Sequence, residues 1–228
     1  MPTQPLIVGN PVLVVVDMQE GGAMSADVAG IPVMPGHTER VVRAEQLVAA
    51  ARTAGVPVVF FQEVHRPSGV DFGRELDGTE GVHCVEGQPG TDLEPSLRPG
   101  PDEFHIVKRR YSGFIGTDFE IVLRGLNAST LILIGGLTDV CVHYTFADAH
   151  QRDFYVRVVS DCVGGSSQYL HDAALTAMEY LQTGAVRTTD EILTALAECR
   201  RQRGSDAECR RQRGSDAEPN PILEGAAR

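Results

Sequence analysis

Cys141 stands in a segment that could make a cysteine nucleophilic. The segment 134–142, IGGLTDVCV, ends an apolar run, turns through two glycines and begins a predicted helix at or near the cysteine. The positive end of a helix and a neighbouring ammonium both favour a thiolate, and they lower a thiol pKa that is ordinarily about 8.5. Lys108 directly follows another apolar run and could supply the ammonium. The chemistry indicated is attack by a thiolate with a depressed pKa.

Asp17 is the candidate general base, and it directly follows the run VLVVV at residues 12–16. Because like charges oppose ionisation, a carboxylate beside a thiol serves best by accepting its proton and returning it to a departing nitrogen. Backbone N–H groups of the 137–141 turn could stabilise the oxyanion. An aspartate at a strand end commonly caps a turn, so the prediction depends on Asp17, Lys108 and Cys141 occurring together.

The elements that must position these side chains alternate between strands and helices. Strands are predicted at residues 11–17, 56–61, 104–107, 130–134, 155–159 and 185–188, and helices at 38–54, 118–126, 140–151, 169–182 and after 188. This alternation predicts a three-layer α/β/α, Rossmann-like fold with a six-stranded parallel sheet. Ligands of such sheets bind beyond the carboxyl ends of the strands, where the three side chains stand. Residues 62–102, rich in Gly, Pro, Asp and Glu, are predicted to form a surface excursion beside the site.

The chain is expected to form one domain over residues 1–196, followed by a tail over 197–228. The tail contains a tandem duplication, in which AECRRQRGSD at 197–206 is repeated at 207–216. Acidic residues in each copy offset much of its basic charge, so an interaction role is disfavoured and no catalytic role is assigned.

Composition excludes several classes of partner. The formal net charge is -11, from 20 Lys and Arg against 31 Asp and Glu, which disfavours nucleic acid and anionic lipid. No apolar run is long enough to span a membrane, and the N-terminus does not resemble a signal peptide. The five cysteines show no CxxC spacing, so free thiols in the cytoplasm are expected.

Three motifs give the chain a resemblance to a known family. They are VVVDMQ at 14–19, VK at 107–108 followed by YSGF at 111–114, and GGLTDVCV at 135–142. Over roughly residues 8–196 the chain resembles the isochorismatase-like cysteine hydrolases, which include nicotinamidases, N-carbamoylsarcosine amidohydrolases, ureidoacrylate amidohydrolases and biuret hydrolases. Members of this family commonly assemble as dimers or tetramers, so the resemblance implies a homo-oligomer.

The resemblance also implies residue roles. Asp17 would be the base, Lys108 the supporting cation and Cys141 the nucleophile that forms an acyl intermediate. A cis peptide bond between Leu137 and Thr138 would aim the amides of Thr138 and Cys141 at the oxyanion.

The pocket wall has a further match. The segment 61–67, FQEVHRP, and the segment 83–90, HCVEGQPG, resemble nicotinamidase segments that present an Asp and two His to a divalent metal. Glu63 replaces the Asp here, and Val64 stands where nicotinamidases usually have an aromatic residue. We therefore expect Glu63 and His65 to bind substrate with no essential metal, the alternative being that Glu63, His65 and His83 ligate zinc or manganese.

Gln182, in MEYLQTG at 178–184, falls where biuret hydrolases carry a glutamine that contacts the substrate. We expect the same contact here, and the alternative is an exposed glutamine at a helix end. No organic cofactor is expected.

The expected activity is hydrolysis of a carbon–nitrogen bond, other than a peptide bond, in a small amide or ureide through a thioester intermediate. A ureide is expected to be preferred over nicotinamide. The alternatives are a nicotinamidase, an isochorismatase-type vinyl ether hydrolase, which needs Asp17 but no thiol, and a binding module that has lost catalysis.

Overall fold

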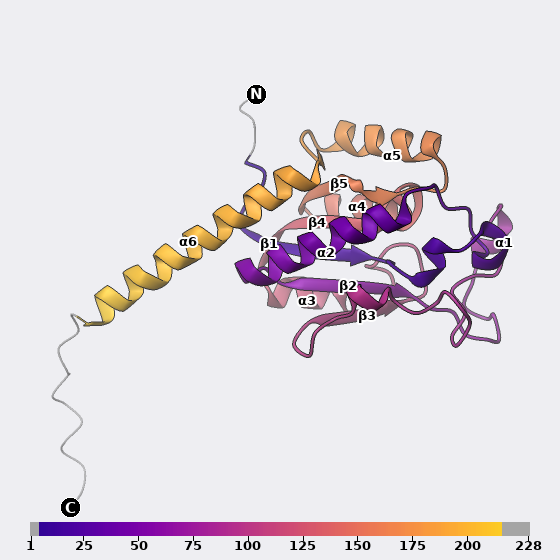
Figure 1. Ribbon diagram of the computed structural model, residues 1–228, viewed down its shortest axis with the longest axis horizontal. Helices are drawn as coiled ribbons and strands as arrows, with labels where there is room; N and C mark the ends of the chain where they lie inside the picture. Colours follow the sequence, from indigo (N-terminus) through magenta and orange to yellow (C-terminus); the bar gives the residue numbers. More distant parts are fainter. Residues whose placement is uncertain (1–4, 216–228) are drawn as a thin grey trace, which may run out of the picture.

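The computed structural model describes residues 5–215, in which six parallel strands form one sheet with helices on both faces (Figure 1). The strand order is β3-β2-β1-β4-β5-β6. The strands are β1 (Asn10–Val16), β2 (Val58–Glu63), β3 (Phe104–Lys108), β4 (Ala128–Gly136), β5 (Tyr155–Gly164) and β6 (Val186–Arg187). The predicted fold class is therefore confirmed.

The helices divide between the two faces of the sheet. The α-helices are α1 (Ala26–Ala29), α2 (His37–Ala54), α3 (Phe119–Gly125), α4 (His143–His150), α5 (Gln168–Leu181) and α6 (Thr189–Ser215). Side chains of α3, α4 and α5 join one hydrophobic cluster, and side chains of α2 and α6 join the other. None of the helices within residues 5–215 is both long and apolar enough to cross a membrane.

Strand β1 shows why helices must cover both faces of the sheet. Val12, Val14 and Val16 pack into the cluster with α3, α4 and α5, whereas Leu13 and Val15 pack into the cluster with α2 and α6. A strand whose successive side chains are all apolar can be stable only between two layers, because neighbouring side chains point to opposite faces. The continuous apolar run thus fixes β1 at the centre of the sheet.

The segment between β2 and β3 is more tightly packed than the predicted surface excursion. Two short 3-10 turns, η2 (Glu75–Asp77) and η3 (Pro95–Leu97), are its helical elements. Single backbone bridges join His65 to Val85 and Leu93 to Gln19. Phe72 and Glu75 are buried within it. The segment therefore covers the carboxyl edge of the sheet.

Helix α6 continues across the expected domain boundary at 196/197 and includes the first copy of the duplication. Ile192 and Leu196 are fully buried, whereas Ala197 and Glu198 are exposed. The second copy ends at residue 216, beyond the described residues. Although the helix is continuous, its packing against the domain weakens after Leu196, so the division at 196/197 stays a prediction.

We expect truncation after Ala197 to leave the fold intact, because the buried side chains of α6 are retained. Circular dichroism and a thermal melt compared with the full chain test this, together with size-exclusion chromatography. Truncation after Thr188 is the control, and it should strongly destabilise the protein because it removes Ile192 and Leu196 from the core. Unfolding of the first truncation, or a change in its oligomeric state, would show that the tail is a packing element.

Candidate active site

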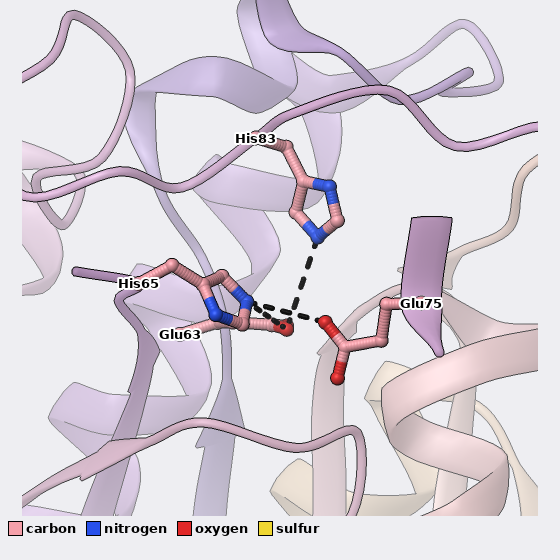
Figure 2. Close-up of side chains that lie close together, drawn as sticks. All are labelled: Glu63, His65, Glu75 and His83. Atoms are coloured by element: carbon pink, nitrogen blue, oxygen red, sulfur yellow. Dashed lines mark hydrogen bonds and ion pairs between the residues drawn. The ribbon is translucent and has the colours of Figure 1, made fainter. Parts of the chain in front are cut away.

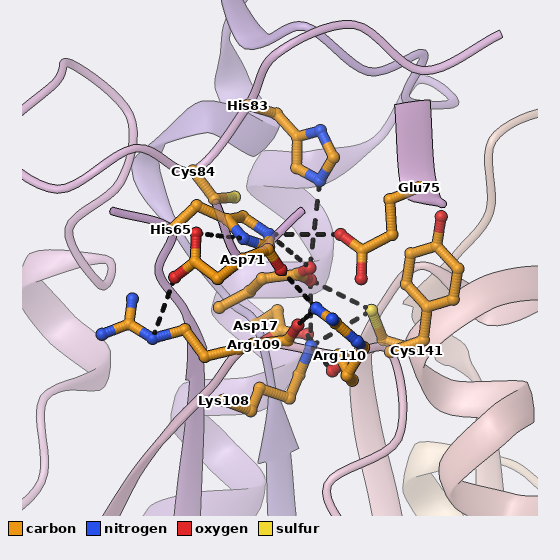
Figure 3. Close-up of polar contacts among 12 residues, drawn as sticks. Asp17, His65, Asp71, Glu75, His83, Cys84, Lys108, Arg109, Arg110 and Cys141 are labelled. Atoms are coloured by element: carbon orange, nitrogen blue, oxygen red, sulfur yellow. Dashed lines mark hydrogen bonds and ion pairs between the residues drawn. The ribbon is translucent and has the colours of Figure 1, made fainter. Parts of the chain in front are cut away.

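The structure brings Asp17, Lys108 and Cys141 together at the carboxyl edge of the sheet (Figure 3). Asp17 follows β1, Lys108 ends β3, and Cys141 lies in the turn after β4. The Lys108 Nζ atom is 2.8 Å from Asp17 Oδ2 and 3.3 Å from Cys141 Sγ. The Lys108 side chain is fully buried. A buried ammonium thus joins the predicted base to the predicted nucleophile.

Glu63 makes a fourth member of this cluster. Its Oε2 atom accepts a hydrogen bond from Lys108 Nζ at 2.9 Å and one from Cys141 Sγ at 3.3 Å. Parallel pairing of β2 and β3 sets Glu63 opposite Lys108 in the sheet, which explains the contact. We expected Glu63 at the substrate wall, and the structure places it against the nucleophile as well. The sequence did not predict the contact between Glu63 and Lys108, because the strand was predicted to end at Phe61.

Local backbone conformation presents Asp17 to the cluster. Asp17 has φ of 47°, in the left-handed region that aspartate tolerates better than most residues. Gly135, at the end of β4, has φ of 110°, and a Cβ atom there would lie 2.0 Å from the Val16 carbonyl oxygen. Only glycine therefore allows β4 to approach β1 closely enough to lead the next turn to the Asp17 side chain.

Burial determines the resting protonation of the acids and the thiol. It raises the pKa of Asp17 to about 6, an effect that Lys108 opposes and the Glu63 charge reinforces. Burial would also raise the pKa of Glu63, but Lys108 and hydrogen bonds from His65 and His83 hold that pKa well below its usual range. Glu63 is therefore the permanent carboxylate, and Asp17 is the carboxyl group that titrates near neutrality.

The expected thiolate with a depressed pKa is wrong for this resting site. Burial raises the pKa of Cys141 well above its ordinary value, and the charges of Glu63 and Asp17 add to that rise against the effect of Lys108. Cys141 lies within η4 (Thr138–Val142), a π-helical turn that continues directly into α4, so the helix dipole acts on the thiol but does not outweigh burial and the carboxylates. The sequence motifs indicate Lys108 and Asp17 beside the thiol, but they do not reveal the Glu63 carboxylate or the extent of desolvation. Cys141 rests as a thiol that must be deprotonated for attack.

The η4 turn presents backbone donors beside Cys141. The Leu137 carbonyl accepts hydrogen bonds from the N–H groups of Val140 at 3.0 Å and Val142 at 3.1 Å. The Cys141 N–H lies between these two donors, and the N–H groups that begin a helical turn have no earlier carbonyl to bind. The expected oxyanion donors therefore lie next to the thiol.

The cis peptide bond was predicted one residue too late. It lies between Gly136 and Leu137, not between Leu137 and Thr138. The Leu137–Thr138 peptide bond, where η4 begins, is trans. The Thr138 side chain is buried, and its Oγ1 atom pairs with His171 Nδ1 at 2.9 Å.

Gln182 does not reach the site, so its expected contact with the substrate is wrong. Its Oε1 atom accepts hydrogen bonds from Val156 N at 2.7 Å and Arg157 at 2.9 Å, and its amide nitrogen donates to the Phe154 carbonyl. These partners lie at the amino end of β5, whereas the candidate site lies at the carboxyl ends of the strands. The hydrogen bonds of Gln182 instead connect the C-terminal end of α5 to the start of β5.

A second polar cluster adjoins Glu63 (Figure 2). His65 Nε2 lies 3.2 Å from Glu63 Oε1 and 3.2 Å from Glu75 Oε2, and His83 Nε2 lies 3.9 Å from Glu63 Oε1. All four side chains are buried. Although burial lowers it, the hydrogen bonds to Glu63 and Glu75 raise the pKa of His65 to about 9. Glu75 was missed, because nothing in its sequence neighbourhood points to the site.

These four residues fit a divalent metal of the kind that the nicotinamidase resemblance implies. One ligand atom from each residue lies within 4.8 Å of the others. Both Glu75 oxygens are buried, and the contact of Oε2 with His65 Nε2 at 3.2 Å depends on the one hydrogen that this nitrogen shares between Glu75 and Glu63. Glu63, His65, Glu75 and His83 would hold the ion, which would supply positive charge next to the nucleophile.

The expectation that no metal is essential stays a prediction. We expect dialysis against a chelator to leave the rate of amide hydrolysis unchanged, because the thiol, the base and the ammonium all belong to the protein. Elemental analysis before and after dialysis verifies removal, and a sample reloaded with zinc is the control. Loss of activity on removal of a stoichiometric metal, with recovery on reloading, would contradict this.

A pocket of roughly 840 Å³, its open mouth included, reaches Cys141. Asp17, Glu63 and Cys141 line its catalytic side, and Tyr111 and Glu80 line another side, joined by a hydrogen bond of 2.7 Å. The enclosed free volume is much smaller, about 90 Å³, which limits a ligand to a compact molecule. Leu137 and His83 are also lining residues, whereas His65, Thr138 and Gln182 are not, so His65 stands behind the wall and not against a substrate.

The raised pKa of Asp17 predicts a pH dependence. If ionised Asp17 is the base, kcat/KM should fall as the pH drops through about 6. Glu63→Gln should move this midpoint to lower pH, because the Glu63 charge helps to raise the pKa of Asp17. Steady-state rates across the acidic range measure the midpoint, with Glu103→Gln, paired to Arg52 away from the site, as the control. A midpoint that rises or stays in place in Glu63→Gln would contradict this assignment.

Known proteins share both the sequence and the fold. An isochorismatase domain model matches residues 11–191. The chain is 31% identical over 210 residues to the ureidoacrylate amidohydrolase RutB of Pseudomonas syringae pv. syringae, and the match covers 83% of this chain and 84% of that protein. A ureidoacrylate amidohydrolase RutB from Methylorubrum extorquens strain AM1 is 33% identical over 202 residues, which cover 78% of this chain and 75% of that protein.

Solved structures of related proteins share this fold. An isochorismatase-like hydrolase from Alkaliphilus metalliredigens superimposes with a TM-score of 0.71 at 27% identity, covering 82% of this chain and 99% of that one. N-carbamoylsarcosine amidase from Thermoplasma acidophilum gives a TM-score of 0.64 at 29% identity, covering 80% and 98%. The expected resemblance and the expected class, a hydrolase of carbon–nitrogen bonds other than peptide bonds, are confirmed. On the extent of the domain match and the identity to these relatives, this chain belongs to the isochorismatase family.

Proposed function

We propose that this chain hydrolyses a carbon–nitrogen bond of a small amide or ureide, with Cys141 as nucleophile, Asp17 as base and Lys108 as supporting cation. The observation that carries the proposal is the contact of one buried ammonium with both the thiol and the Asp17 carboxylate, in a pocket that Asp17 and Cys141 line. The amidohydrolase relatives support the same reaction class.

The first half of the reaction forms a thioester. Ionised Asp17 accepts the thiol proton as Sγ of Cys141 attacks the substrate carbonyl carbon. Lys108 stabilises the sulfur as negative charge develops, and the Cys141 amide in the η4 turn donates to the carbonyl oxygen. Asp17 then gives its proton to the leaving nitrogen, the carbon–nitrogen bond breaks, and ammonia or an amine departs.

The second half restores the thiol. A water molecule enters in place of the amine and loses a proton to Asp17 as it attacks the thioester carbon. The carbon–sulfur bond breaks, and the proton returns from Asp17 to Cys141. A base with a pKa of about 6 suits both halves, because it is ionised near neutrality and still returns a proton readily.

The rival reactions fit the pocket less well. Vinyl ether hydrolysis gives no purpose to a buried thiol held between Lys108 and Glu63. A pyridine ring would favour an aromatic wall, and apart from the two histidines the described lining residues include one aromatic side chain, Tyr111. A ureide would instead find several polar partners in the lining, such as Glu80 and Tyr111. We therefore keep the preference for ureides over nicotinamide.

A homo-oligomer is part of the proposal. Helix α5 carries large apolar side chains that are exposed in the single chain, namely Tyr169, Leu170, Tyr180 and Leu181. A second copy that covered them would remove this apolar surface from water.

The experiment is an ammonia-release assay on one panel of compounds, containing biuret, N-carbamoyl amino acids, aliphatic amides and nicotinamide. We expect ureides or carbamoyl compounds to give the highest kcat/KM. Cys141→Ala and Asp17→Asn should each lower kcat at least about a thousandfold, and the double variant should be little worse than either, because the residues act as one unit. Lys108→Ala should do nearly the same.

The folding of each variant is checked by circular dichroism, since Lys108→Ala leaves two buried carboxylates without their cation. A folded Cys141→Ala enzyme that kept tens of per cent of the activity would refute the nucleophile. Vinyl ether hydrolysis retained in that variant would support the rival reaction, and ligand binding without any turnover would indicate a binding module.

A further inference from the structure

His171 connects helix α5 to the turn that carries the nucleophile. It lies in the first turn of α5 and is 7% exposed, and its Nδ1 atom is 2.9 Å from the Thr138 hydroxyl oxygen. Thr138 is fully buried and is the first residue of η4, the turn that contains Cys141. One buried hydrogen bond therefore joins α5 to the turn from which the thiol projects.

The residue after Thr138 is bonded to the segment that leads into α5. Asp139 Oδ1 accepts a hydrogen bond from the Ser166 backbone N–H at 2.9 Å, and Asp139 Oδ2 accepts one from the Ser166 hydroxyl. Ser167 caps α5, since its side chain accepts a hydrogen bond from the Leu170 N–H at 3.3 Å. Two successive residues of η4 are thus bonded to the start of one helix.

Gly165 allows η4 and the start of α5 to approach each other. A Cβ atom on Gly165 would lie 2.7 Å from Asp139 Oδ1 and 2.9 Å from the Cβ atom of His171. Because packed atoms do not come so close, a larger residue at this position would push the start of α5 away from the turn. The chain therefore has its smallest residue where the two elements meet.

The ion cluster alone does not position the backbone of the turn. Lys108 and Glu63 contact the Cys141 sulfur at 3.3 Å, which holds the end of a side chain. Attack also needs the Cys141 N–H at the oxyanion, and the conformation of η4 sets the place of that donor. The turn is π-helical, a rare backbone form that is frequent at functional sites.

His171 acts on the turn by hydrogen bonding and not by charge. Burial lowers the pKa of His171. The charge of Arg40 adds to this effect, and the charges of Asp172 and Asp139 oppose it. A neutral imidazole has one donor and one acceptor nitrogen, and the Thr138 hydroxyl can pair with either. His171 and Thr138 do not line the pocket, so their hydrogen bond does not serve contact with a substrate.

We propose that His171 is a positioning residue of the reaction: through Thr138 it fixes η4 so that the thiol and the N–H of Cys141 are aligned for attack. The inference rests on the proposed role of Cys141 as nucleophile, and it adds a residue from α5, a helix that contributes no group to the ion cluster. His171 binds no substrate and transfers no proton.

The first test is His171→Phe, which keeps a buried ring and removes both nitrogens. The kcat should fall about tenfold to a hundredfold, the effect of displacing the reacting atoms by about an ångström. KM should change little, because the residues that line the pocket are the same. Ammonia release from biuret and N-carbamoylglycine measures both constants. His171→Asn keeps a polar atom near the position of Nδ1 and should recover most of the lost kcat, which a loss of packing alone does not predict.

His150→Phe is the matched control. His150 ends the neighbouring helix α4, and its Nδ1 atom pairs with Gln182 Nε2 at 3.2 Å, away from the site. This variant should keep the wild-type kcat. Thr138→Val removes the other partner of the hydrogen bond and should lose as much as His171→Phe, and the double variant should lose no more than either single one. If His171→Phe does not fold, Thr138→Val carries the comparison, with Thr138→Ser losing less.

Hydrogen exchange separates this inference from the proposed function. In His171→Phe the backbone N–H groups of residues 138–142 should exchange faster than in the wild type, whereas those of β1 and β4 should keep their rates. His171→Asn should restore slow exchange in the turn.

The inference would be overturned by an unchanged kcat in His171→Phe, by a KM that rises as much as kcat falls, by no recovery in His171→Asn, or by unchanged exchange in η4. Absence of ammonia release by the wild type from every compound would instead count against the proposed function. In that case the exchange rates would still decide whether His171 holds the turn.

Discussion

The buried ammonium of Lys108 is the interaction on which the rest of the site depends. It is fully enclosed, and four groups surround its nitrogen at 2.8 to 3.3 Å, namely Asp17, Glu63, Cys141 and the Arg110 carbonyl. Neither carboxylate would remain ionised in this environment without the cation, and the cation would not remain charged without them. Consistent with this, burial would lower the pKa of Lys108, but the charges of Asp17, Cys141 and Glu63 raise it well above its ordinary value. One ion cluster therefore fixes three strand ends in one place.

The asymmetry between the two carboxylates gives this cluster its chemical direction. Glu63 receives hydrogen bonds from Lys108, His65 and Cys141, so its charge is permanent. Asp17 has oxygens that make no geometrically good hydrogen bond among the described residues, and its pKa lies near 6. This asymmetry favours Asp17 over Glu63 as the acceptor of the thiol proton in the proposed reaction. Two acids that flank one cation acquire different roles because their other neighbours differ.

The pocket has charged groups on two sides, and the two sides differ in whether these groups have counterions. On the catalytic side every charge has a partner, because Lys108 and the histidines of the segment between β2 and β3 balance the carboxylates. On the side of α2, Arg40 has backbone partners and no counterion among residues 5–215. A site whose charges are all paired can carry out proton transfers without a change in its net charge. A charge without a counterion instead favours a ligand of opposite sign. The balanced arrangement suits the proton transfers of the proposed reaction.

The amino-acid sequence by itself determined the layer architecture and the positions of Asp17, Lys108 and Cys141 at strand ends. Apolar runs that end in a polar residue encode both facts locally, since a buried parallel strand must be apolar throughout and its carboxyl end faces the site. Short motifs identified the family for the same reason. These signals need no knowledge of which strands are neighbours.

Only the tertiary structure decided what surrounds those side chains. The order β3-β2-β1 places Glu63 against Lys108, and the packed segment between β2 and β3 brings Glu75 to His65, although nothing in the local sequence predicts either contact. The protonated state of the Cys141 thiol follows from burial and from two carboxylates that are remote in sequence. The expected substrate contact of Gln182 was wrong because the position of a residue along a helix does not say which end of the sheet it faces. A pKa and a binding contact depend on charges and desolvation within a few ångströms, and those distances are set by strand order and loop packing, which local patterns do not encode.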